Sequence, residues 1–167
     1  IAGCRRAAGR GRGLSDDAPA FDAAEARRRA LGWLARREYG RHELIEKLTA
    51  RGCDEQLAAE TVAALVVENM VSDERFIEAL IHARRARGYG PLYIRRELEE
   101  KGIDRGLIEH ALDPRSDAWL DDLRQVRSKK FGGRKPASLA ERARQTRFLQ
   151  YRGFSHEQIR QVLGSDD

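Results

Sequence analysis

The chain has 167 residues, of which 35% are charged and 7% aromatic, with only four prolines and a net charge of +5. This composition is typical of a solvated all-helical protein and argues against one large apolar core. The longest apolar stretch, Leu57 to Val67, contains Glu60 and Thr61 and falls short of the roughly 20 residues needed to cross a bilayer, so no membrane partner is expected.

The first segment, residues 1–20, is rich in Gly, Ala and Arg and has no helical apolar period. It therefore predicts a flexible basic leader, with a basic arm that touches nucleic acid as the alternative. Its arginines are not followed by an apolar block, so we expect no secretory signal and a cytoplasmic location.

Residues 21–71 predict a first three-helix repeat. Asp22 with Glu25 forms a capping-box pattern that opens a helix. A second helix ends at Gly52, a residue suited to the left-handed conformation that follows a helix, and Asp54 caps a third.

Residues 72–115 repeat the pattern, with Ser72 as a helix cap and Pro91 at a helix start, where a missing amide is tolerated. Four residue pairs are separated by 50 positions: Tyr39 and Tyr89, Leu44 and Ile94, Leu48 and Leu98, Gly52 and Gly102. A constant offset over four matches indicates an internal repeat.

Residues 116–167 predict a third, basic repeat that begins near Asp117 and has a longer first connection around Gly132 to Leu139. Strands are not predicted, because period-two alternation is nearly absent. The expected fold is therefore all-α: an elongated tandem array of three three-helix, helix-turn-helix-like repeats, about nine helices and no sheet, in which neighbouring units share surfaces.

Positive charge is concentrated in the third repeat. Between Arg124 and Arg160 there are eleven Lys or Arg residues and only two acids, Glu141 and Glu157. This excess is typical of a polyanion binder, most often of nucleic acid, whereas a surface built only for solubility usually intersperses both signs. The predicted nucleic-acid or filament contacts are Arg124, Arg127, Lys129, Lys130, Arg134, Lys135, Arg142, Arg144, Arg147 and Arg152.

In the first two repeats, arginines alternate with glutamates, which suits protein contact and pairing within helices. The candidate protein contacts are Arg36, Arg37, Arg84, Arg85, Arg95 and Arg96. Tyr39 and Tyr89 occupy equivalent positions of the repeat, which favours packing in turns over stacking on bases.

No enzyme is expected. A phosphate-binding G-x-x-x-x-G-K is absent, and Gly88-Tyr89-Gly90 lacks the third glycine and the preceding strand of a dinucleotide site. Adjacent acids such as Glu99 and Glu100 point in different directions on a helix. The two cysteines, Cys4 and Cys53, and the four histidines are scattered, so neither a metal site nor a cofactor is predicted.

Five stretches resemble proteins of the RecX family in order and spacing: residues 35–44, 72–76, 86–91, 95–103 and 147–155. The resemblance covers about residues 22–164. It implies a bacterial cytoplasmic regulator of tandem three-helix repeats that lies in the groove of RecA filaments and lowers their ATPase, recombinase and coprotease activities, thereby modulating DNA repair and the SOS response. The family has no catalytic residues, so every site residue named above is a predicted binding residue.

The sequence departs from the family in two places. The leader has no matching motif, and Cys53 stands where Ile103 and Phe154 follow the glycine in the other repeats, which predicts looser packing.

The expected partners are the RecA filament and DNA, single- or double-stranded, held largely by its backbone. The chain is expected to be a monomer, with a dimer as the alternative. A helix-turn-helix-like DNA-binding transcriptional regulator is a second interpretation, but the third helices expected at residues 55–68 and 105–112 are acidic or neutral, unlike helices that read bases. A structural adaptor without a nucleic-acid role fits the cationic third repeat poorly.

Overall fold

The computed structural model describes residues 21–164, so the leader predicted for residues 1–20 lies outside the described range. Within that range the chain forms nine helices and no strand. The helices are α1 (Ala23–Leu34), α2 (Arg41–Thr49), α3 (Glu55–Val67), α4 (Asp73–Ala86), α5 (Pro91–Glu100), α6 (Arg105–Ala111), α7 (Ala118–Phe131), α8 (Leu139–Tyr151) and α9 (His156–Leu163).

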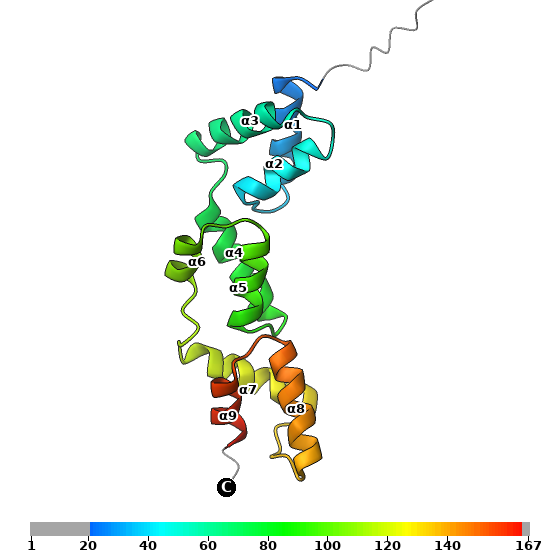
Figure 1. Ribbon diagram of the computed structural model, residues 1–167, viewed down its shortest axis with the longest axis vertical. Helices are drawn as coiled ribbons and strands as arrows, with labels where there is room; N and C mark the ends of the chain where they lie inside the picture. The colour runs from blue at the N-terminus through cyan, green and yellow to red at the C-terminus, as the bar shows by residue number, and fades with distance from the viewer. Residues whose placement is uncertain (1–20, 165–167) are drawn as a thin grey trace, which may run out of the picture.

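The helices form three consecutive groups along one long axis, with the two ends of the described chain at opposite ends of the molecule (Figure 1). We call α1–α3 unit 1, α4–α6 unit 2 and α7–α9 unit 3. The predicted all-α array of three three-helix repeats is confirmed.

Helix starts carry most of the predicted caps. At Asp22 only half of the predicted capping box forms, because Asp22 accepts from the Glu25 amide while the Glu25 carboxylate pairs with arginines of the same helix. The Ser72 side chain accepts a hydrogen bond from the Arg75 amide at 3.2 Å, and Pro91 is the first residue of α5. Ser155 and Gln158 form a reciprocal capping box. Gly52 has φ +93°, in the left-handed region that favours glycine. Local sequence therefore sets the length of these helices.

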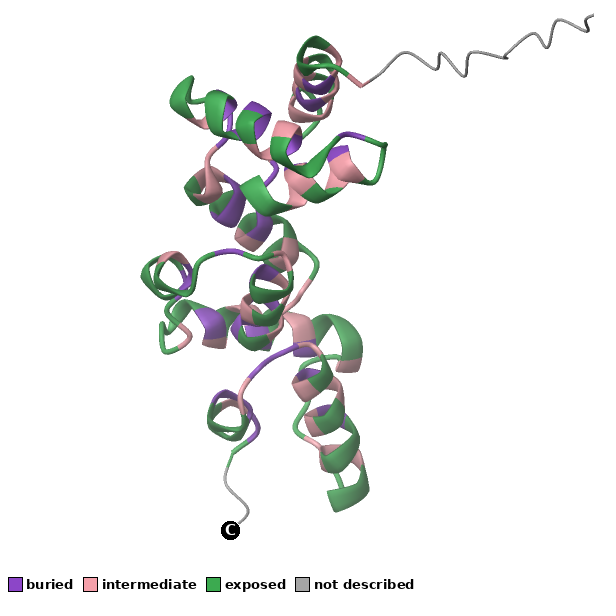
Figure 2. Cartoon of the chain, turned by 45° about the horizontal axis from the view of Figure 1, so that its top comes forward, coloured by how far each residue is buried: buried purple, intermediate pink, exposed green. Residues whose placement is uncertain are grey.

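Each unit has its own small core, and buried residues occur along the whole length of the array (Figure 2). The repeat-related Leu44, Leu48, Ile94 and Leu98 are all completely buried. Cys53 is also buried, and it belongs to the core of unit 1, so the smaller side chain is not exposed to solvent, while the looser packing expected there stays a prediction.

Helix α7 is shared between two cores. Trp119, near its start, packs with the core of unit 2, and its Nε1 donates to the Asp113 carbonyl at 2.9 Å. Leu123, one turn later, packs in the core of unit 3. Units 2 and 3 are therefore joined by one continuous helix, which contributes a buried residue to the core of each.

The extra residues of the third repeat lie partly within a helix. Helix α8 has 13 residues, whereas the corresponding α2 and α5 have 9 and 10. The expectation that the extra length lies around Gly132 to Leu139 is therefore only partly correct, because about one turn of it extends α8.

The junction between units 1 and 2 combines charged contacts with close packing. Arg75 pairs with Glu38 at 3.0 Å, and Lys101 pairs with Glu43 at 3.3 Å. A Cβ on Gly40 would lie 3.0 Å from the Ile103 side chain. The ion pairs depend on protonation and on salt, whereas the packing does not.

The junction between units 2 and 3 is held by the backbone. The Gly90 amide donates to the Arg152 carbonyl at 2.7 Å, and the Leu92 amide donates to the Gly153 carbonyl at 3.0 Å. A Cβ on Gly153 would lie 2.4 Å from both the Cβ and the amide nitrogen of Tyr93. Only glycine permits this close approach.

Candidate nucleic-acid interface

The ten basic residues predicted to bind nucleic acid fall into two groups, and Arg127 typifies the first. Its side chain is buried, with Nε donating to Gln145 Oε1 at 2.9 Å and Nη2 donating to the Arg134 carbonyl. Arg127 therefore fixes the connection between α7 and α8 from inside unit 3, and we remove it from the candidate surface.

Three more of the predicted residues are held by the protein itself. Arg142 donates to the carbonyls of Leu163 and Gly164 at the end of α9. Arg152 donates to the Arg87 carbonyl at 2.9 Å, across the junction with unit 2. Arg124 pairs with Asp121 at 2.7 Å. The contacts of Arg142 and Arg152 give these guanidinium groups a structural role, whereas the Arg124 pair is solvent-exposed and stabilises little.

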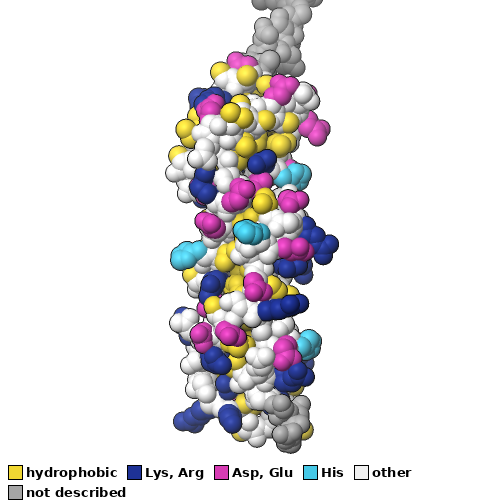
Figure 3. Space-filling view, turned by 90° about the vertical axis from the view of Figure 1, so that its left-hand side faces the viewer, with side chains coloured by type: hydrophobic (Ala, Val, Ile, Leu, Met, Phe, Trp, Pro, Cys, Tyr) yellow, Lys and Arg dark blue, Asp and Glu magenta, His cyan; other side chains and the backbone are white. Residues whose placement is uncertain are grey.

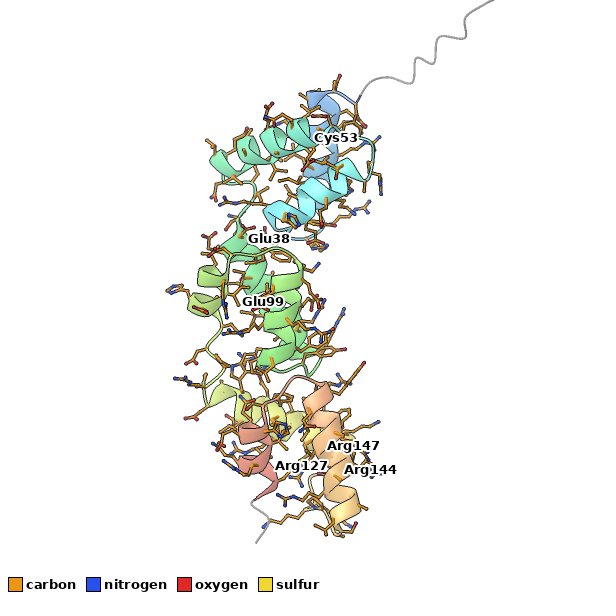
Figure 4. The ribbon with its side chains drawn as sticks, viewed as in Figure 1. Glu38, Cys53, Glu99, Arg127, Arg144 and Arg147 are labelled. Atoms are coloured by element: carbon orange, nitrogen blue, oxygen red, sulfur yellow. The ribbon has the colours of Figure 1, made fainter. Side chains whose placement is uncertain are left out.

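The remaining six basic residues are exposed, and none has an ion-pair partner within the described residues. They are Lys129, Lys130, Arg134, Lys135, Arg144 and Arg147. They come from the last turn of α7, from the connection to α8, and from α8 itself. Figure 4 shows Arg144 and Arg147 projecting outward from α8, whereas Arg127 lies on the inner side of that helix. We call these six residues the free cations of unit 3.

Aromatic rings and arginines alternate beside the free cations. Arg152 lies 5.0 Å from the Tyr89 ring centroid and 5.2 Å from that of Phe148. Phe148 packs edge-to-face on Phe131 at 5.3 Å, and Arg144 lies 5.6 Å from the Phe131 ring. This row runs from unit 2 into unit 3, so the two units present one continuous surface.

A cleft of about 230 Å³ opens at the same junction. Its basic lining residues come from both units: Arg85, Arg87, Lys129, Lys130 and Arg152. Asp122 also lines it and pairs with Arg85 at 2.7 Å. The sequence did not single out Arg87 or Phe148 as site residues, because only the fold brings α4 beside α7 and α8. The cleft carries a net positive charge and suits an anionic group.

The candidate protein contacts in units 1 and 2 are mostly paired. Arg37 pairs with Glu43 at 2.6 Å and lies 3.5 Å from the centroid of the buried Tyr39 ring. Arg84 hydrogen-bonds Glu97, which raises the pKa of the Arg84 guanidinium. The other pairs are Arg85 with Asp122 and Arg96 with Glu100. Arg36 and Arg95 form no ion pair with any described residue.

One face of the molecule shows how the charges are distributed. In Figure 3, basic and acidic side chains are interspersed over the middle of this face, with apolar side chains between them, and basic side chains predominate at its lower end. The middle of this face therefore has no uniform basic patch, in contrast to the free cations of unit 3. Mixed charge of this kind suits contact with a protein surface.

Other site types find little support in residues 21–164. That part of the chain contains no group of three or more His, Cys, Asp or Glu placed to hold a metal ion. Burial, reinforced by the charge of Asp54, raises the pKa of the Cys53 thiol and so disfavours the reactive thiolate. None of the described helices is long and apolar enough to span a membrane.

Comparison with known proteins gives consistent matches. The first, second and third three-helix domains of RecX match residues 26–65, 72–112 and 117–163, respectively. The regulatory protein RecX of Pseudomonas entomophila strain L48 is 43% identical over 141 residues, which cover 84% of this chain and 91% of that protein. The RecX of Pseudomonas fluorescens strain Pf-5 is 42% identical over 144 residues, with 84% and 93% covered.

Two solved structures share the fold. The crystal structure of RecX from Lactobacillus salivarius superposes with a TM-score of 0.72 at 21% identity, covering 86% of this chain and 96% of that one. A second crystal structure of a regulatory protein RecX gives a TM-score of 0.71 at 17% identity, covering 86% and 72%.

Proposed function

The chain belongs to the RecX family of regulatory proteins, and from this premise we propose that it binds the RecA nucleoprotein filament and restrains it. In this proposal the chain is a non-enzymatic, monomeric regulator in the cytoplasm. It lowers the ATPase, recombinase and coprotease activities of the filament and thereby modulates DNA repair and the SOS response.

The observation that carries the proposal is the unequal charge of a long array. Units 1 and 2 present arginines that are mostly paired with acids, whereas unit 3 presents six free cations. We infer that units 1 and 2 contact the recombinase subunits and that unit 3 approaches the DNA backbone within the filament. Several weak contacts on one body raise the overall affinity, because each contact increases the effective concentration of the next.

A sequence-reading transcriptional regulator is the second candidate. Such a protein places a helix in the major groove, with Arg, Asn or Gln side chains directed at base edges. Helix α3 contains no arginine, and the single arginine of α6, Arg105, pairs with Glu109 at 3.3 Å. The free cations instead suit contact with phosphates, which carry no sequence information.

Co-sedimentation distinguishes the two functions. The full chain is mixed with RecA-coated single-stranded DNA, with bare duplexes of several sequences, and with RecA alone. We expect preferential binding to the coated strand and a fall in its ATPase rate as the chain is added. Selective binding to one duplex sequence, with no preference for the coated strand, would contradict the filament proposal and support the transcriptional one.

A further inference from the structure

Helix α8 carries an exposed tyrosine that the core does not use. Tyr151 is the last residue of α8, and 82% of its surface is exposed. The other three tyrosines differ from it: Tyr39 is buried, and Tyr89 and Tyr93 are half-buried and stack on each other at 4.2 Å. An aromatic ring held so far out in water contributes little to folding.

Tyr151 shares a helix face with two of the free cations. Arg144, Arg147 and Tyr151 stand at positions i, i+3 and i+7 of α8, so their side chains leave the same side of the helix. All three are exposed, and neither arginine pairs with a described acid. The face therefore offers two guanidinium groups and one ring, all accessible to a ligand.

The same face continues into the aromatic and arginine row. Arg144 lies over Phe131, which contacts Phe148, and Lys130 lies 5.9 Å from the Phe148 ring centroid. Arg152, the residue after Tyr151, connects this row to Tyr89 of unit 2. Positive groups therefore flank Tyr151 and continue past it along one surface.

We propose that Tyr151, with Arg144 and Arg147, forms a stacking site for single-stranded nucleic acid. The two arginines would hold consecutive phosphates while a base stacks on the Tyr151 ring. This combination is the one by which proteins bind single strands with little sequence preference. A duplex offers no free base face to a ring on a convex helix, because its bases are already stacked on each other. This inference rests on the nucleic-acid role proposed for unit 3, and it specifies that the nucleic acid bound there is single-stranded.

The test measures binding of the full chain to bare DNA, without RecA. The probes are a fluorescently labelled oligodeoxythymidine of about 20 nucleotides, long enough for one binding site, and a duplex of equal length. Tyr151→Ala is expected to weaken binding to the single strand about 5- to 150-fold, the range seen when a stacking ring is removed. The affinity for the duplex should change by less than about twofold, which is small beside the change expected when one stacking contact is lost.

Two further variants separate stacking from charge. Tyr151→Phe keeps the ring and should bind the single strand as the parent chain does. The double variant Arg144→Gln and Arg147→Gln should lower the slope of log affinity against log salt by about 1.4, or about 0.7 for each phosphate contact. Tyr151→Ala should leave that slope unchanged. Leu139→Ala is the matched control, since Leu139 is 80% exposed at the other end of α8.

The outcomes are separable. If Tyr151→Ala binds the single strand as tightly as the parent chain, or loses affinity for the single strand and the duplex equally, the stacking site is wrong. If the variant loses affinity only for the RecA-coated strand, Tyr151 contacts protein, so the stacking site is wrong while the filament proposal stands. If the parent chain binds neither bare probe, the stacking site and the nucleic-acid role of unit 3 are both refuted.

Discussion

The Nε of Arg127 donates to Oε1 of Gln145 at 2.9 Å, and both side chains are buried between α7 and α8. The guanidinium also reaches the Arg134 carbonyl. The positive charge of Arg127 inside unit 3 is therefore hydrogen-bonded by uncharged acceptors. If one acceptor is removed, a buried N–H group of the guanidinium is left without a partner, and its desolvation is no longer compensated.

Gln145→Leu should lower the free energy of unfolding by about 2 kcal/mol, because the buried Arg127 loses its acceptor. The double variant Arg127→Met and Gln145→Leu should cost less than the sum of the two single variants by about 1 kcal/mol, since it removes charge and acceptor together. Urea denaturation measures all three. Arg147→Met, on the exposed face of α8, should stay within about 0.5 kcal/mol. Strict additivity would show that the two side chains do not depend on each other.

Gly153→Ala should destabilise the junction between units 2 and 3. The new methyl group would meet the Tyr93 backbone at 2.4 Å, and the residue has φ +90°. We expect the free energy of unfolding to fall by about 3 kcal/mol. One part is the strain of alanine in the left-handed conformation, and the other is the displacement of the backbone hydrogen bonds at the junction.

Gly52→Ala is the matched control for this variant. Gly52 has φ +93°, but no atom lies within 4 Å of the added Cβ. Gly52→Ala should therefore lower the free energy of unfolding only by the strain of the left-handed conformation, about 1 kcal/mol. Thermal unfolding followed by circular dichroism compares the two variants, and equal losses would contradict the tight contact with Tyr93.

The contribution of Glu43 to stability should disappear in acid. Partial burial alone would raise the pKa of Glu43, but hydrogen bonds and charges from Arg37 and Lys101 outweigh it and hold the pKa below its ordinary value of 4.5. A lowered pKa in the folded state means that the stabilisation is complete above the unfolded value and is lost as the pH falls through the folded one.

Glu43→Gln should therefore lower the free energy of unfolding by about 1 kcal/mol at pH 7, a shift in Tm of about 3 °C. The difference from the parent chain should shrink below about pH 4.5, where the unfolded carboxyl begins to protonate. Glu100→Gln, in an exposed pair within α5, should have a small effect at both pH values. A difference that is constant from pH 7 to pH 3 would exclude the charge of Glu43 as its cause.

Neutralising the connection between α7 and α8 should change the salt dependence of DNA binding. Arg134→Gln with Lys135→Gln removes two free cations, so the slope of log affinity against log salt for duplex DNA should fall by about 1.8, or about 0.9 per phosphate contact. Fluorescence anisotropy at several salt concentrations measures the slope. Arg105→Gln, a paired arginine of unit 2, should leave it unchanged. An unchanged slope in the double variant would remove these two residues from the interface.

The sequence predicted the helices and the repeat well, because local signals determine both. Capping residues and left-handed glycines act over a few positions, and the 50-residue offset placed Leu44 and Ile94 at equivalent core positions. The sequence did not predict that α7 contributes to the cores of both unit 2 and unit 3, because Trp119 and Leu123 lie on one apolar face of the helix. Only the packing shows that the two side chains enter different cores.

The candidate site was predicted only as a charge excess. Counting cations cannot distinguish Arg127, which is buried, from Arg147, which is exposed, because both occur in the same basic segment. The carbonyls that hold Arg142 and Arg152 belong to other helices, so no local pattern marks these arginines as structural. Tyr151 could have been singled out from its place four residues after Arg147, on the same helix face.

The two junctions differ in compliance. Units 2 and 3 share α7 and main-chain hydrogen bonds, which salt does not screen, whereas unit 1 adds two ion pairs to its packing against unit 2. Raising the ionic strength should therefore weaken the first junction more than the second.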